Sequence, residues 1–196
     1  MAQPAPAPRM DEAAYLAWVE TQPCRHEFVQ GRVYAVREPD EPDGPQACEL
    51  RSRVVATLGG ALRAHLRGLP CRVHEGHVRL SLPRTAAHLY PDLVVDGPVP
   101  SRLPGSRSAG PQPLMVAEVL SPSTGSVYPG VRFAHYRTLD SLRDYVLLDP
   151  CQRRADVCRR DVDGLWTVHT FESGDQLELA SLEWRMPVVQ VFAGLP

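Results

Sequence analysis

Two acidic residues stand inside apolar stretches of the chain, where a charge needs a partner. Glu118 interrupts the run MVAEVLSPST, and Asp92 follows Pro91 at the start of YPDLVVD. An ionised carboxylate in an apolar strand is costly unless it is paired or bound to a cation. If the two segments are neighbouring strands joined by a long loop, both carboxylates lie at one edge of a sheet and can share a divalent ion.

Carboxylate oxygens, together with water and phosphate oxygens, are the ligands that Mg²⁺ and Mn²⁺ prefer. Such an ion would polarise a phosphodiester, activate the attacking water and balance charge on the leaving oxygen. We therefore interpret Asp92 and Glu118 as the metal ligands of a site for nucleic-acid hydrolysis. A plainer interpretation also fits the pattern alone, with Asp92 as a strand-end or turn residue and Glu118 as the partner of an arginine.

The elements that position these acids follow from the apolar spacing. Apolar positions recur at three and four residues over 46–67, which predicts the longest helix, and a shorter helix is predicted from Asp11 to before Pro23. HEFVQGRVYAV predicts a hairpin that turns at Gln30 and Gly31. The remaining predictions are strands over 71–75, 77–82, 92–96, 114–120 and 144–150, an irregular loop over 97–113, a helix over 130–138, an antiparallel meander through ADVCRRD, LWTVHTF and QLELASL, and a short closing helix in MPVVQVFAGLP. Mixed strands with two sizeable helices predict an α/β or α+β fold in which helices flank a sheet.

The composition is that of a soluble globular protein, with 43% apolar and 22% charged residues among 196. We expect one domain over 11–196, after a flexible leader of alternating proline and alanine over 1–10. No apolar stretch approaches the ~18 residues that cross a bilayer, and the N-terminus lacks the apolar core of a signal peptide. A cytoplasmic protein without a membrane partner is therefore expected. Five cysteines without a C-x-x-C pair indicate reduced thiols.

The order of these motifs resembles one known family. HEFVQGRV, a long helix, YPDLVVD, MVAEVLSPST, a helix ending in AHY, and LRDYVLLDP together resemble the bacterial Uma-two family of restriction-endonuclease-like proteins, within the PD-(D/E)XK nuclease superfamily; the resemblance spans 11–195. It implies a central mixed sheet flanked by helices, a Mg²⁺ or Mn²⁺ cofactor, DNA as substrate, and Asp92 and Glu118 as the metal-binding acids. Glu27, in the fragment RHEF, matches the family's N-terminal glutamate and is expected to assist the site.

The chain departs from the pattern of this resemblance at its basic residue. The superfamily's lysine, two residues after the second acid, falls on Leu120, and the family's own lysine and aspartate positions on the following helix hold Arg132 and Tyr128. Arginine can stabilise a charged transition state and hold a phosphate, but with a pKa above ~12 it cannot give up a proton. Arg132 is expected in the stabilising role. The departures leave open a second function, that of a catalytically inactive nuclease-fold protein that binds DNA or a protein partner.

Charged residues elsewhere have both a functional and a plain interpretation. Arg51, Arg63 and Arg67 on the long helix are candidates for phosphate contacts, or are simply a solvated flank. Glu75 lies on a strand near the Asp92 strand and either reaches the cleft or pairs with an arginine. The acidic loop over 38–44 either repels a phosphate backbone or is only solvated.

Two further groups of residues complete the predictions. The seven histidines show no zinc spacing, so none is interpreted as a metal ligand. No nucleophile-elbow motif surrounds Ser121, Ser123 and Thr124, and these three residues are interpreted as a turn that caps the next helix. The apolar faces of LWTVHTF and of the C-terminal tail suit either a homodimer surface, which the resemblance favours, or ordinary core packing.

Overall fold

A mixed six-stranded sheet lies at the centre of the computed structural model, which describes residues 9–36, 44–97, 112–121 and 128–195. Strands β7 and β8 are parallel, and all other neighbours in this sheet are antiparallel. The strand order is β10 (Trp166–Phe171), β9 (Arg154–Arg160), β8 (Asp144–Asp149), β7 (Pro113–Val119), β6 (Leu93–Asp96) and β3 (Arg72–Glu75). The predicted mixed sheet is confirmed.

A smaller antiparallel sheet of four strands carries the N-terminal hairpin. Its order is β2 (Arg32–Ala35), β1 (His26–Val29), β5 (Ala87–Leu89) and β4 (Leu80–Leu82), with the short helix η1 (Pro83–Thr85) between β4 and β5. Gln30 and Gly31 have φ angles of 49° and 84°, and two consecutive residues with positive φ are typical of a tight hairpin turn. The hairpin expected at this point is confirmed.

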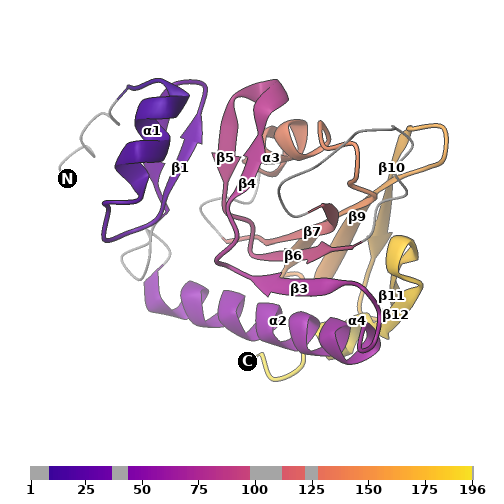
Figure 1. Cartoon of the computed structure of the whole chain (residues 1–196). Coiled ribbons are helices and arrows are strands. Elements are labelled where there is room, and N and C mark those ends of the chain that lie inside the picture. The colour runs from indigo at the N-terminus through magenta and orange to yellow at the C-terminus, as the bar shows by residue number, and fades with distance from the viewer. Residues whose placement is uncertain (1–8, 37–43, 98–111, 122–127, 196) are drawn as a thin grey trace.

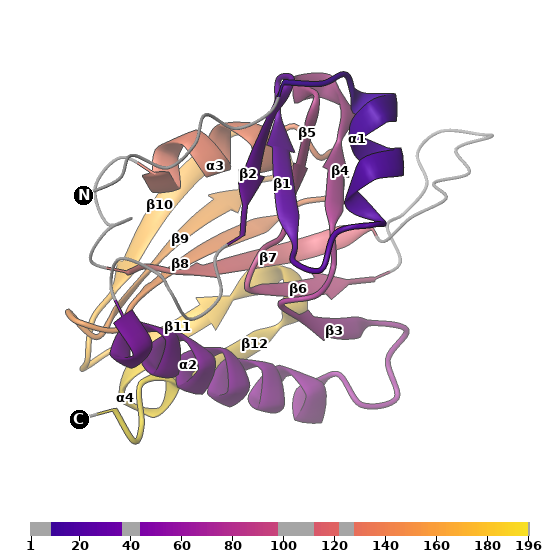
Figure 2. The ribbon, with the colours of Figure 1, turned by 90° about the vertical axis from the view of Figure 1, so that its left-hand side faces the viewer.

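Helices and the C-terminal hairpin cover the two faces of the central sheet (Figures 1 and 2). On one face lie α2 (Gly44–His65), α4 (Val188–Val191), and the hairpin of β11 (Gln176–Leu179) and β12 (Trp184–Pro187), which are linked by η2 (Ala180–Leu182). Apolar side chains of α2 and of the tail form one buried core there, including Val54, Leu58, Leu62, Val188 and Val191. The tail therefore serves core packing.

The opposite face of the central sheet packs against the four-stranded sheet and α3 (Tyr128–Tyr136). A second buried core, with Leu82, Leu89, Tyr136 and Tyr145, fills this layer. Helix α1 (Glu12–Val19) lies on the outer side of the hairpin, and the Asp11 side chain caps it by accepting the Ala14 N–H at 2.7 Å. The acids of the proposed site belong to the layer between the two sheets.

Several predicted boundaries shift in the structure. The strand expected over 77–82 is limited to β4, β5 was not predicted, and Asp92 immediately precedes β6. Predictions for the leader over 1–8, the acidic residues of 38–43, most of the loop over 97–113, and Ser123 and Thr124 fall outside the described residues. Within the described ranges, no helix has both the length and the apolar character needed to span a membrane.

Candidate active site

Asp92 and Glu118, called the acid pair below, come together because their strands are neighbours. Leu93 of β6 pairs with Ala117 of β7 in antiparallel register, so the next residues along, Asp92 and Glu118, face each other across the two strands. The Asp92 carboxylate accepts the backbone N–H of Val119 through Oδ2 at 2.7 Å. Both side chains remain partly accessible, with exposed fractions of 15% and 12%.

Arg132 of α3 joins Glu118 to Glu27 of β1. Its Nε donates to Glu118 Oε1 at 2.8 Å, and its Nη1 donates to Glu27 Oε1 and Oε2 at 3.0 and 2.8 Å. Its Nη2 donates to the Tyr90 carbonyl at 3.2 Å. Arg132 and Glu27 are both buried, so this ion pair is shielded from water.

Glu27 is fully engaged by protein groups. In addition to Arg132, its Oε1 accepts the backbone N–H of Tyr90 at 2.8 Å. Among the described residues, no group of three or more histidine, cysteine, aspartate or glutamate side chains is arranged to hold a metal ion. Glu27 thus lies next to the acid pair as the anchor of Arg132.

Tyr136 is a member of the site that the motifs did not single out. Its hydroxyl donates to Glu118 Oε1 at 2.8 Å and accepts a hydrogen bond from Arg132 Nη2 at 3.0 Å. It follows Arg132 by four residues, and this spacing places two side chains on one helix face. The four-residue spacing from Arg132 could therefore have predicted from the sequence that Tyr136 lies at the site.

Burial sets the protonation of the acid pair. Burial, with a smaller contribution from the nearby Asp92 charge, raises the pKa of Glu118 from 4.5 to about 7, although the Arg132 charge opposes this shift. Burial also raises the pKa of Asp92, while Arg51 and the Val119 N–H lower it. The pKa of Tyr136 is raised well above 10.0 by burial, so its hydroxyl stays protonated. A positive ion beside the acid pair would therefore favour its ionised state.

The three arginines predicted to contact nucleic acid have different surroundings. Arg51 Nη1 lies 3.7 Å from Asp92 Oδ1, at the rim of the acid pair. Arg63 Nη2 lies 2.6 Å from Glu75 Oε1, which agrees with the plain interpretation of Glu75 as the partner of an arginine. Arg67 is exposed near the end of the helix segment, away from the acid pair. The structure thus brings only Arg51 of the three to the site.

Two further positions of the family pattern, those of the expected lysine and aspartate, hold Leu120 and Tyr128 in this chain. Leu120, where the superfamily's lysine would fall, directly follows β7, and its N–H donates to the Leu148 carbonyl at 2.8 Å. Tyr128, at the family's aspartate position, is the first residue of α3. Arg132 is therefore the basic residue that lies against Glu118, as Arg51 lies against Asp92.

Comparison with known proteins agrees with this arrangement. The model of the family Uma2, described as "putative restriction endonuclease", matches residues 12–189. A protein of Synechocystis sp. described as uncharacterized is 28% identical over 97% of this chain and 95% of its own length, and a second is 25% identical over 85% and 89%. A crystal structure from Anabaena variabilis, described as a putative nuclease belonging to DUF820, superposes with a TM-score of 0.63 at 15% identity, over 88% of this chain and 92% of that one. That likeness shows a shared fold, and the match to the family model shows that the chain belongs to the Uma2 family of putative restriction endonucleases.

Proposed function

We propose that this protein is a Mg²⁺- or Mn²⁺-dependent endonuclease that hydrolyses phosphodiester bonds of DNA at the acid pair. The observation that carries the proposal is the meeting of Asp92 and Glu118 from adjacent strands, partly buried and facing one another. Two carboxylates held this close repel each other, and burial has already raised the pKa of both. A divalent cation held by both carboxylates would offset this repulsion.

The oxygens of the acid pair suit a hard cation. Within the described part of the chain, the hydrogen bonds to Glu118 end on Oε1, and the backbone hydrogen bond to Asp92 ends on Oδ2. Glu118 and Asp92 are the residues that would hold Mg²⁺ or Mn²⁺, which needs few protein ligands because it keeps several waters. A bound ion would polarise the phosphodiester and promote attack by water.

Arg132 acts in this proposal as a positioning residue. All three of its guanidinium nitrogens donate to protein acceptors, which fixes the Glu118 carboxylate and neutralises Glu27. Tyr136 donates to the same Glu118 oxygen and limits its rotation. Arg51, at the rim beside Asp92, is the cation suited to an incoming phosphate, since its side chain is 28% exposed.

Cleavage of supercoiled plasmid tests the proposal. Wild type should nick or linearise DNA in Mn²⁺ and be inactive in EDTA, and Asp92→Asn should reduce cleavage to background. Arg132→Lys should increase the rate if arginine weakens the site. Cleavage that is unchanged by Asp92→Asn would refute the proposed chemistry.

A second candidate function is that of a nuclease-fold protein that binds DNA without cleaving it. The observation in its favour is the ion pair of Arg132 with Glu118 at 2.7 Å and with Glu27 at 2.8 Å, which neutralises carboxylates without a metal. Arginine also cannot serve as a general base. Retained DNA binding without cleavage by either wild type or Arg132→Lys would establish this alternative.

We also propose that the protein is a homodimer, joined through β10. This strand ends the six-stranded sheet, and the exposed fractions of Leu165 and Val168 are 66% and 67%. An exposed strand edge with apolar side chains readily pairs with another strand. Within LWTVHTF, Trp166 and Phe171 pack against the cores, whereas the exposed Leu165 and Val168 are the side chains proposed to meet a second copy.

A further inference from the structure

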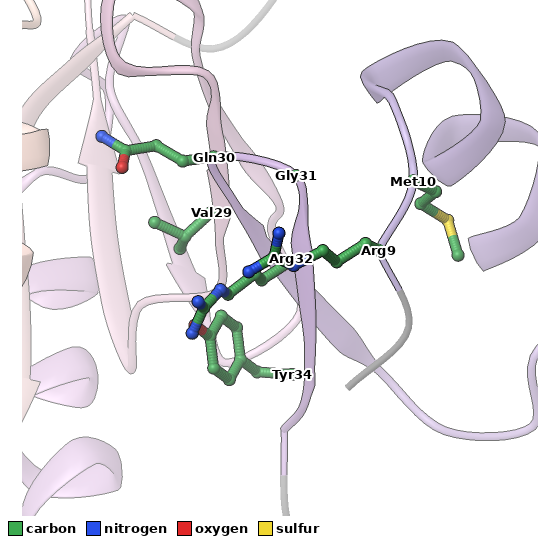
Figure 3. Close-up of a pocket in the computed structure, with 7 residues that line it drawn as sticks. All are labelled: Arg9, Met10, Val29, Gln30, Gly31, Arg32 and Tyr34. Carbon is green, nitrogen blue, oxygen red and sulfur yellow. The ribbon is translucent and has the colours of Figure 1, made fainter. Parts of the chain in front are cut away.

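A pocket of about 680 Å³ lies on the β1–β2 hairpin, outside the acid pair (Figure 3). Its lining includes Arg9, Arg32 and Tyr34, together with the turn residues Gln30 and Gly31. Pockets that hold a small molecule or one building block of a polymer have volumes of about 300–1,000 Å³. The pocket is thus large enough for a single nucleotide.

Two positive charges lie side by side at this pocket. Arg9 and Arg32 face each other in an isolated antiparallel bridge, and the backbone N–H of Met10 donates to the Gly31 carbonyl at 3.0 Å next to it. Residues opposite each other in such a bridge project on the same face, and like charges there are destabilising. In the part of the chain that the structure describes, neither arginine has an acidic partner. This arrangement is what an anion would stabilise.

An aromatic ring accompanies the two arginines. Tyr34 is two residues after Arg32 on β2, so both side chains project from the same face of the strand. Figure 3 shows the side chains of Arg9 and Arg32 extending in one direction across β2, toward the side where the Tyr34 ring lies. The ring is 45% exposed, which leaves a surface on which a base can stack.

This face of the hairpin is the one that holds the proposed catalytic site. Tyr34 is directly opposite Glu27 in the β1–β2 register, and Arg32 is directly opposite Val29. Glu27 binds Arg132, and Val29 packs against the core that includes Tyr136 of α3. A DNA strand that reaches the acid pair from this side therefore passes Tyr34 and Arg32, which lie on the same face of the hairpin as the buried Glu27.

We propose that Arg9, Arg32 and Tyr34 form a nucleotide subsite for a single-stranded segment of the DNA substrate. A phosphate lies between the two guanidinium groups, and the adjoining base stacks on the Tyr34 ring. A base in a duplex is already stacked on its neighbours, so the contact with Tyr34 requires an unpaired nucleotide. The assignment rests on the proposed function only for the nature of the substrate, and the subsite should bind DNA without metal.

Fluorescence polarisation in EDTA tests the subsite separately from catalysis. A short fluorescein-labelled single strand and the duplex of the same sequence are titrated with full-length protein. The single strand should bind more tightly than the duplex. Tyr34→Leu should weaken single-strand binding about tenfold, whereas Tyr34→Phe, which keeps the ring, should bind as wild type does.

The contribution of Arg32 is measured by salt dependence. Arg32→Gln should weaken binding and lower the slope of log K against log salt by about 0.7, the value for one phosphate contact on a single strand. Tyr34→Leu should leave that slope unchanged. Arg185→Gln on β12, on the other side of the central sheet, is the matched control and should leave the affinity unchanged.

Three results would overturn the subsite. The first is that both Arg32→Gln and Tyr34→Leu bind the single strand with wild-type affinity. The second is that wild type binds the single strand and the duplex with equal affinity. The third is that wild type binds free dAMP as tightly as it binds the single strand. If wild type does not cleave plasmid but shows the predicted binding pattern, the proposed endonuclease activity is refuted and the proposed subsite is supported.

Discussion

Arg132 donates its Nε–H to Glu118 Oε1 over 2.8 Å, so the residue at the family's lysine position is the ion-pair partner of a proposed metal ligand. The same guanidinium binds Glu27 through Nη1. A lysine has a single ammonium group and cannot present this planar set of donors to two acids. The substitution therefore changes how the charge is distributed, and not only whether a proton can be transferred.

Removing the Arg132 charge should strongly destabilise the fold. Arg132→Met leaves Glu27 buried without its cation, and breaking a buried ion pair from one side costs about 3–5 kcal/mol. Arg132→Lys should lose less, since a cation remains. Urea unfolding followed by circular dichroism measures both changes. Arg185→Met, in an exposed ion pair with Glu178, is the control and should unfold close to wild type; an equally stable Arg132→Met would contradict the buried network.

Glu118 should make stability depend on pH. Because burial raises its pKa from 4.5 to about 7, the folded protein binds this proton more tightly than the unfolded chain, and stability falls as pH rises through that interval. Glu118→Gln cannot titrate and keeps an acceptor for Arg132. Without metal, it should melt a few degrees above wild type when the pH exceeds 7, and the two should converge near pH 4.5. If wild type instead gains stability relative to Glu118→Gln as the pH rises over this interval, the attraction of the Arg132 charge outweighs the effect of burial on the pKa of Glu118.

Tyr136→Phe should move the pH profile of metal binding. Its hydroxyl donates to Glu118 and thereby lowers the pKa of that carboxyl. Without this donor the pKa of Glu118 rises further, so Mn²⁺ binding measured by calorimetry should require a higher pH. The free energy of unfolding should fall by about 1–3 kcal/mol, because the hydrogen bonds of Tyr136 to Glu118 and Arg132 are lost. A loss of stability with an unchanged pH profile would reduce Tyr136 to a purely structural role.

The sequence predicted the parts of the fold that local chemistry determines. Gln30 and Gly31 indicated the hairpin because few residue pairs accept two positive φ angles. The apolar spacing predicted α2 within two residues at either end, from an expected 46–67 to Gly44–His65. The acids within apolar runs also led to the strands that bring Asp92 and Glu118 together.

The parts that the sequence did not predict depend on distant contacts. β5 has three residues, too few for a periodic pattern, and its buried His88 is accommodated by Glu12 of α1 at 2.8 Å. The anchoring of Arg132 by Glu27 joins residues far apart in the chain, and only the packing of α3 against the hairpin creates it. Arg9 and Arg32 likewise become neighbours only through the bridge that precedes α1.

The proposed dimer makes a simple prediction for β10. Val168→Lys places a charge on the exposed face of this edge strand and should convert a dimer to a monomer in sedimentation equilibrium, since a charged edge disfavours pairing. Val189→Lys on α4, where the native side chain is 54% exposed, is the matched control and should remain dimeric. A monomeric wild type, or a dimer that persists in Val168→Lys, would exclude this interface.

The most direct measurement is titration of the protein with Mn²⁺ by isothermal calorimetry at a pH above 7. Wild type should bind the ion at a saturable site, Asp92→Asn and Glu118→Gln should each abolish that binding, and Glu178→Gln on β11 should leave it unchanged. If both substitutions at the acid pair leave Mn²⁺ affinity at the wild-type value, then Asp92 and Glu118 do not form the metal site.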